Sequence, residues 1–306
     1  MAKTFSDIRA YEDSRILLAA HRGISGGNIP CNTLAAFEIA LRQGTDIMEL
    51  DVQKSRDGKL WVFHEGKEAP HLCSVKNFIK DNDEAGIRYM RYVNQDDDPT
   101  QFPVNTLDEV LDYLKDKCYV NLDHCWDFFP DAVACVRRHK MEEQIILKSA
   151  PKEQFFKAIK ECAPDIAYMP ILKRVDEYCD YLDTLGINYA GNEVLFSTLD
   201  DETASPEYIE KMHKRGKKLW VNAIIYNYKV QLSAGLSDDF SLVNNPDDGW
   251  GKLADMGYDI IQTDWMLMLR EYLESSGKIM KRKCRTFGGN VRGTFAKVPL
   301  KPLKNF

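Results

Sequence analysis

Short runs of β-branched, aromatic and other apolar residues alternate along this chain with amphipathic segments. Each run is continuously apolar over several residues, which is typical of strands that are buried on both faces. The segments between them place apolar residues three or four positions apart, as an amphipathic helix requires. The predicted strands are Ile16–His21, Asp46–Val52, Cys118–Asp123, Ile145–Ser149, Ala167–Leu172, Val194–Thr198, Leu219–Ile224 and Asp259–Asp264.

The order of these elements predicts an α/β fold built from parallel strands joined by crossover helices. The first helix illustrates the signals, because Asn32 or Thr33 can cap its start and Gly44 can end it. Eight such units in 306 residues favour a closed (β/α)₈ TIM barrel over an open doubly wound sheet. No GxGxxG motif follows the first strand, so a dinucleotide-binding domain loses its main support.

Two features depart from the simple repeat. The run Leu60–His64 follows the second strand after an Asp57-Gly58 turn signal, which predicts a short hairpin. The stretch 65–103 is long, irregular and rich in Asp and Asn, and we expect a small insertion over the barrel mouth. We therefore divide the chain into a barrel over residues 1–275, with the insertion at about 65–103, and a C-terminal extension over 276–306.

The composition is that of a globular enzyme, with 44% hydrophobic and 29% charged residues. A net charge of −6 argues against a nucleic-acid partner. No apolar stretch reaches membrane-spanning length, and the first 15 residues lack the hydrophobic core of a secretory signal. The eight cysteines are dispersed without a CxxC pair, so we expect reduced thiols. These features predict a cytoplasmic protein without stable membrane insertion, and they leave a homo-oligomer open.

The C-terminal extension differs in charge from the rest of the chain. Residues 276–306 contain nine Lys or Arg residues and no Asp or Glu, so the preceding residues are strongly acidic. We expect this extension to lie along the acidic body of the protein rather than to contact an anionic surface.

Polar residues stand at or near the ends of many predicted strands, where the chemistry of this fold is located. Glu49 and Asp51 are two positions apart on one strand, so their side chains point the same way. Paired carboxylates repel each other unless a cation lies between them, and carboxylates suit Mg²⁺ or Ca²⁺. Asp123 ends the next strand of the barrel and would complete an all-oxygen triad.

Histidines and basic residues complete this set. His21 and His64 end strands and can transfer protons near neutral pH. Arg22 can clamp two phosphate oxygens. Lys148, in an otherwise apolar strand, is either a second phosphate contact or a side chain that reaches the barrel rim.

His124 directly follows Asp123 and should point away from the site unless the strand has already ended there. The other histidines, His71, His139 and His213, are interpreted as structural.

An ordered set of N-terminal motifs resembles the glycerophosphodiester phosphodiesterase family. The set comprises HRG at 21–23, NT at 32–33, ELD at 49–51, DG at 57–58 and VFH at 62–64, with weaker similarity at 102–114, 219–222 and 261–264. The resemblance implies a (β/α)₈ hydrolase that depends on a divalent cation and cleaves a small-molecule glycerophosphodiester. It also implies that His21 and His64 are the acid and base, and that Glu49, Asp51 and Asp123 bind the metal.

Three departures from the family pattern bear on substrate binding. The family usually has Glu-x-Lys in the third strand, whereas this chain has Asp123-His124-Cys125, so the phosphate-binding lysine is missing. Lys148 is our hypothesis for its substitute. Glu65 stands where the family commonly has Asp, and the insertion lacks the usual Thr-rich opening that helps to choose the substrate.

Two further functions remain open on the sequence. A phospholipase-like enzyme would cleave a lipid phosphodiester through a cyclic phosphate and would need an apolar rim on the insertion. A non-catalytic barrel would keep the metal and phosphate sites without turnover. We set aside a sugar hydrolase, because two carboxylates on one strand cannot flank a glycosidic bond.

Overall fold

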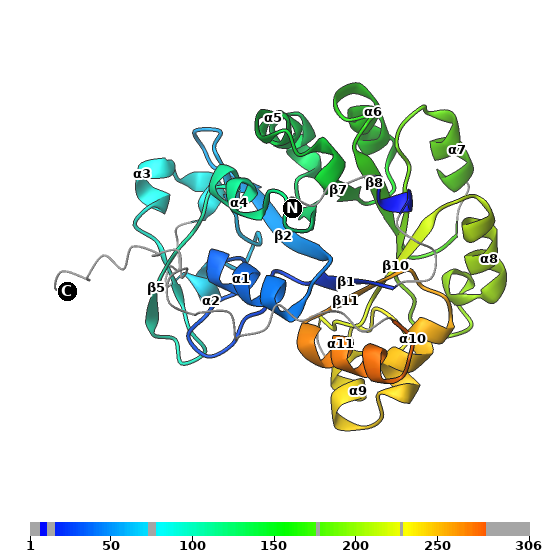
Figure 1. Ribbon diagram of the computed structural model, residues 1–306. Coiled ribbons are helices and arrows are strands. Elements are labelled where there is room, and N and C mark those ends of the chain that lie inside the picture. Colours follow the sequence, from blue (N-terminus) through cyan, green and yellow to red (C-terminus); the bar gives the residue numbers. More distant parts are fainter. Residues whose placement is uncertain (1–6, 11–15, 73–77, 176–177, 227–228, 280–306) are drawn as a thin grey trace.

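The computed structural model describes residues 7–10, 16–72, 78–175, 178–226 and 229–279. Eight parallel strands form a closed barrel, because β1 pairs with both β2 and β11 (Figure 1). The predicted TIM barrel is therefore confirmed. The barrel strands are β1 (Leu17–Ala20), β2 (Ile47–Lys54), β6 (Tyr119–Asp123), β7 (Ile145–Ser149), β8 (Ala167–Leu172), β9 (Gly191–Val194), β10 (Lys218–Asn222) and β11 (Ile260–Thr263).

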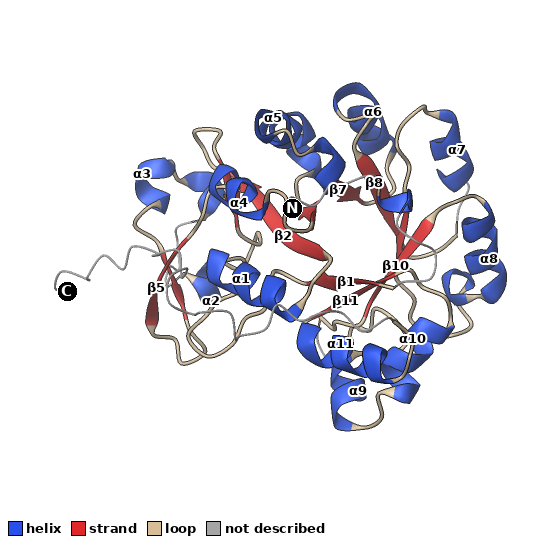
Figure 2. Cartoon of the chain, viewed as in Figure 1, coloured by secondary structure: helices blue, strands red, loops and turns tan. Residues whose placement is uncertain are grey.

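Helices cover the outside of the barrel (Figure 2). Thr33 caps α1 through a hydrogen bond to the Ala36 amide, and Gly44 ends it in the left-handed conformation, as the sequence predicts. The α-helices are α1 (Leu34–Gln43), α2 (Glu68–His71), α3 (Glu84–Ile87), α4 (Leu107–Leu114), α5 (Phe129–His139), α6 (Glu153–Cys162), α7 (Tyr178–Thr184), α8 (Pro206–Lys214), α9 (Asp238–Val243), α10 (Lys252–Asp255) and α11 (Met266–Ser275). Short 3₁₀ turns lie at Ile8–Ala10, Ile79–Asp81, Trp126–Phe128, Glu142–Gln144 and Glu202–Ala204, and a π-helical turn at Asp247–Gly251.

Two apolar layers explain why the strands read as continuous hydrophobic runs. Leu17, Ala19 and Ile47 belong to a buried cluster that also includes Trp220. The alternate residues, such as Leu18 and Met48, belong to a separate and larger cluster with the helices. Each strand therefore buries both of its faces, which is the usual condition of a parallel barrel strand.

The barrel strand β9 was predicted a few residues too far along the chain. The sequence predicts a strand over Val194–Thr198, whereas β9 spans Gly191–Val194. The error has a physical cause, because β9 carries two polar residues, Asn192 and Glu193, that are buried and hydrogen-bonded. The apolar residues that follow β9 lie outside the sheet.

The hairpin is confirmed, because β3 (Leu60–Val62) pairs antiparallel with β2. The insertion that follows contains α2, α3 and a two-stranded antiparallel sheet of β4 (Arg91–Val93) and β5 (Pro99–Pro103). A hydrophobic cluster joins the insertion to the hairpin, because Trp61 on β3 packs with Ile87 and Tyr92. Asn28, in the loop after β1, donates to Gln101 in the insertion at 2.9 Å. The insertion therefore contacts a loop at the carboxyl end of a barrel strand.

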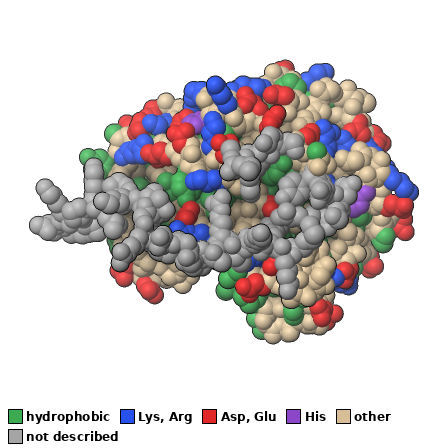
Figure 3. Space-filling view, in the orientation of Figure 1, with side chains coloured by type: hydrophobic (Ala, Val, Ile, Leu, Met, Phe, Trp, Pro, Cys, Tyr) green, Lys and Arg blue, Asp and Glu red, His purple; other side chains and the backbone are tan. Residues whose placement is uncertain are grey.

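The basic extension and two of the cysteines lie at least partly outside the described residues. Of the basic extension, residues 280–306 lie outside the described residues. Cys31, Cys125, Cys135, Cys162 and Cys179 are free thiols, and Cys73 and Cys284 are not described. Within the described ranges, no helix combines the length and the apolar composition that crossing a membrane requires. Basic and acidic side chains are interspersed on the face shown in Figure 3.

Candidate active site

Three carboxylates gather where β2 and β6 lie side by side. Asp51 and Asp123 are directly opposed in the parallel register, and Glu49 lies two residues before Asp51 on β2. One oxygen from each of the three carboxylates can be chosen so that all lie within 4.8 Å of one another. The structure thus brings together the three residues that the sequence predicts as metal ligands.

The electrostatics of this cluster fit a divalent cation. Burial, reinforced by the neighbouring charge of Asp51, raises the pKa of Glu49 to about 8. Burial also raises the pKa of Asp123. Oδ1 of Asp51 is buried and has no hydrogen-bond partner among the described residues. A hard cation would supply the missing positive charge, and all-oxygen donors are the ligands that Mg²⁺ and Ca²⁺ prefer.

Arg22, in the loop after β1, contacts two of these carboxylates. Its backbone has φ of 55°, the left-handed region, and its amide donates to Oε2 of Glu49 at 2.9 Å. Its Nε atom lies 2.9 Å from Oδ2 of Asp51, an ion pair without well-directed hydrogen-bond geometry. Asn32 donates to the same oxygen at 2.8 Å. Burial acts to raise the pKa of Asp51, but the nearby Arg22, His64 and His124 together with the Asn32 hydrogen bond outweigh it, so that pKa is lowered.

His21 follows β1 and is held by an acidic residue from the opposite end of the chain. Its Nδ1 atom lies 2.8 Å from Oδ1 of Asp264, which directly follows β11. Burial disfavours the charged imidazolium, but the hydrogen bond and charge of Asp264 outweigh burial, so the pKa of His21 is raised. The Asp264 amide in turn donates to the buried carboxylate of Asp238 at 2.8 Å. No pattern in the sequence pointed to Asp238, which lies in α9, a helix that was not predicted.

His64 has the opposite character. Its Nδ1 atom lies 2.7 Å from the carbonyl oxygen of Glu65, so Nδ1 carries the hydrogen and Nε2 carries the lone pair. This Nε2 atom is buried and has no hydrogen-bond partner among the described residues. Burial lowers the pKa of His64, which favours its neutral form.

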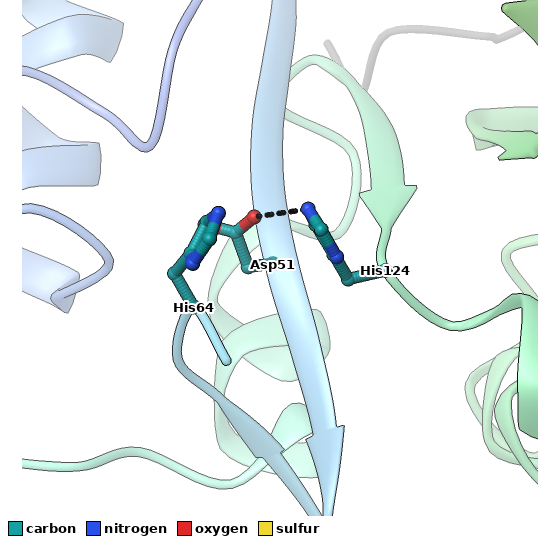
Figure 4. Close-up of side chains that lie close together, drawn as sticks. All are labelled: Asp51, His64 and His124. Atoms are coloured by element: carbon teal, nitrogen blue, oxygen red, sulfur yellow. Dashed lines mark ion pairs between the residues drawn. The ribbon is translucent and has the colours of Figure 1, made fainter. Parts of the chain in front are cut away.

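A third histidine, His124, also enters the site. Strand β6 ends at Asp123, and His124 has φ of 57°, so the alternation of side chains stops before it. Its Nε2 atom lies 3.8 Å from Oδ1 of Asp51 (Figure 4). Its ring centroid is 4.7 Å from those of His64 and Trp126. The sequence predicts that His124 points away only if the strand continues; because β6 ends at Asp123, the exception applies and His124 enters the site.

Lys148 is buried inside the barrel rather than at its rim. Only 1% of its side chain is exposed, and Nζ lies 2.6 Å from Oε2 of Glu193. The same ammonium group lies 3.1 Å from the centre of the Trp220 ring, a cation–π contact. Asn222 donates to the other oxygen of Glu193 at 2.6 Å. Glu193 was not predicted as a site residue, because it lies in β9, whose position was predicted a few residues too far along the chain.

The fold and the site together define a (β/α)₈ barrel with carboxylates and histidines gathered at the carboxyl ends of its strands. Residues 168–273 match a family model, DUF4996, whose description is a domain of unknown function. A glycerophosphodiester phosphodiesterase of Bacillus subtilis is 30% identical over 179 residues, which are 52% of this chain and 60% of that protein. The chain covers 60% and 54% of the length of the first curated relatives that it matches.

Solved structures share the fold over almost the whole chain. A glycerophosphoryl diester phosphodiesterase from Parabacteroides distasonis superposes with a TM-score of 0.72 at 18% identity, covering 89% of this chain and 93% of that one. An Oleispira antarctica phosphodiesterase, solved with the product sn-glycerol-3-phosphate, gives a TM-score of 0.63 at 18% identity, with coverage of 84% and 96%. The chain is therefore similar to glycerophosphodiester phosphodiesterases in sequence over about half of its length, and to their solved structures in fold over most of it.

Proposed function

We propose that this protein hydrolyses a glycerophosphodiester to glycerol phosphate and an alcohol, with the help of a divalent cation. The observation that carries the proposal is the triad of Glu49, Asp51 and Asp123 beside two histidines whose pKa values are shifted in opposite directions. Environments that push two titratable groups apart in this way are typical of an acid and base pair.

The three carboxylates would hold Mg²⁺ or Ca²⁺. When bound, such a cation polarises phosphoryl oxygens and neutralises the negative charge gained in the transition state. Arg22 and Asn32 contact Asp51 and thereby keep its Oδ1 atom directed into the cluster. We propose that the remaining part of the Arg22 guanidinium holds a phosphate oxygen.

The two histidines would divide the proton transfers. His64 is the candidate base, because its Nε2 atom carries a lone pair and its lowered pKa keeps it neutral. It would take a proton from the nucleophile, either water or a neighbouring hydroxyl of the substrate. His21 is the candidate acid, because Asp264 favours its protonated form. It would give its proton to the departing alkoxide.

Lys148 remains a proposed second contact for the phosphate. Its charge is already paired with Glu193, so the two anions would share one ammonium group. Such sharing would weaken the contact relative to that of an unpaired lysine.

The experiment is a panel of glycerophosphodiesters incubated with the purified chain, with Mg²⁺ or Ca²⁺ and with or without a chelator. We expect glycerol phosphate to be released, and the chelator to abolish its release. The variant Glu143→Gln, at an exposed position, is the matched control for the loss of one acidic residue in Glu49→Gln. Absence of release from every diester, with a folded protein and either cation, would contradict the proposal and would leave the non-catalytic barrel.

A further inference from the structure

Three potential metal ligands converge beside the carboxylate triad, and two of them, Asp51 and His64, also have roles in the proposed reaction. Asp51, His64 and His124 each offer one ligand atom, and these three atoms lie within 4.8 Å of one another. Figure 4 shows the carboxylate of Asp51 between the two imidazole rings. The mechanism above needs no role for His124.

Two of these atoms are acceptors that lack a donor. Oδ1 of Asp51 and Nε2 of His64 are both buried without a hydrogen-bond partner among the described residues. Neither can satisfy the other, because the carboxylate only accepts and the hydrogen of His64 is committed to the Glu65 carbonyl oxygen at 2.7 Å. Buried acceptors that face each other in this way call for a positively charged group between them.

The surroundings hold the three groups as a metal site would. Histidine ligands usually donate their other N–H group to a carbonyl or carboxylate, as His64 does to Glu65. The ring of His124 is flanked by the rings of His64 and Trp126, each 4.7 Å away between centroids. Oδ2 of Asp51 is occupied by Arg22 and Asn32, which leaves Oδ1 as the available donor.

This site shares Asp51 with the carboxylate triad but differs from it in the type of its other ligand atoms. Two imidazoles and one carboxylate suit borderline metals such as Zn²⁺, whereas an all-oxygen set suits Mg²⁺ or Ca²⁺. Ligand atoms around a tetrahedral Zn²⁺ lie about 3.3 Å apart, given bonds of about 2.0 Å. The observed 3.8 Å between Nε2 of His124 and Oδ1 of Asp51 requires only a small closing movement.

We propose that Asp51, His64 and His124 form a second metal site that takes Zn²⁺ and that its occupation inhibits the enzyme. A metal ion on Nε2 of His64 would use the lone pair that the base needs, so His64 could no longer accept a proton. The inhibitory part rests on the proposed function, whereas the binding part does not. Mg²⁺ and Ca²⁺ prefer oxygen ligands and would not act in this way.

The test compares the wild-type chain with two variants at one position. His124→Asn keeps a residue that tolerates the left-handed backbone, and His124→Phe keeps an aromatic ring beside Trp126. His213→Asn, in α8 beside Asp259, is the matched control for the loss of one histidine. The metal-free proteins are titrated with Zn²⁺ in a calorimeter, with circular dichroism as the check on folding.

We expect both His124 variants to bind Zn²⁺ at least about tenfold more weakly than the wild type, and His213→Asn to bind it equally well. In the presence of Mg²⁺, Zn²⁺ should inhibit the wild type and the control, while the ratio of rates with and without Zn²⁺ stays near one in the His124 variants. Equal Zn²⁺ affinity in a folded His124 variant and the wild type would overturn the site. Binding through His124 without inhibition would overturn the inhibitory role. A chain that binds Zn²⁺ through His124 but hydrolyses no diester would contradict the proposed function instead.

Discussion

His21 and Asp264 connect the first and last strands of the barrel at 2.8 Å between Nδ1 and Oδ1. The two residues are 243 positions apart in the sequence, and they meet because β1 pairs with β11. The protonation of His21 by way of Asp264 therefore depends on the pairing of β1 with β11, which closes the barrel. This relationship gives the proposed acid a measurable signature.

Asp264→Asn should lower the pKa of His21, because it removes the charge that outweighs burial. The acid must be protonated, so its activity is lost as the pH rises through its pKa. We expect the alkaline limb of the pH–rate profile to move to lower pH by about one unit. The acidic limb, set by the lowered pKa of His64, should stay in place. An unmoved alkaline limb would remove His21 from the acid role.

His21→Ala and His64→Ala should each reduce turnover about a hundredfold or more, because each removes one proton transfer. The melting temperature should change little in His64→Ala, since among the described residues its ring makes one hydrogen bond, to the carbonyl oxygen of the adjacent Glu65. Steady-state kinetics and thermal unfolding of the same preparations test this. An unchanged rate in His21→Ala would refute the assignment.

Addition of Mg²⁺ or Ca²⁺ should raise the melting temperature of the metal-free protein, because a cation that binds only the folded state stabilises it by about 2.7 kcal/mol at one hundred times its dissociation constant. Asp123→Asn should lose most of this effect. Without metal, the variant should be at least as stable as the wild type, because one repelling charge has gone. An undiminished shift in Asp123→Asn would exclude Asp123 as a ligand.

Lys148→Met should destabilise the fold by about 3–5 kcal/mol, because it leaves Glu193 buried without its cation. Adding Glu193→Gln in the same chain should restore most of that loss. If Lys148 also contacts phosphate, the stable double variant should still show a raised KM. Denaturant unfolding measures the first effect and steady-state kinetics the second, and a normal KM would limit Lys148 to a structural role.

The sequence predicted the barrel and much of its mouth because both depend on local patterns. Continuous apolar runs marked most strands, and the two-residue spacing of Glu49 and Asp51 fixed their common direction. Strand β9 escaped because a buried ion pair between Lys148 and Glu193 replaces apolar residues in the barrel interior. Pairing across the barrel is a long-range property that local patterns do not contain.

The direction of the His124 side chain could not be predicted for a different reason. It depends on one backbone angle, φ of 57°, at a residue type that usually adopts negative values. Asp264 was recognised as a residue at a strand end, but its partnership with His21 requires knowledge of which strands close the barrel. The sequence thus predicted the chemical groups of the site better than their pairings.

The apolar cluster that joins the hairpin to the insertion, formed around Trp61, Ile87 and Tyr92, has an evolutionary consequence. Because this cluster is separate from the two clusters of the barrel, the insertion can change its length and surface without repacking the barrel interior. Under the proposed function, such changes would alter the preference for the released alcohol while the reacting centre stays the same.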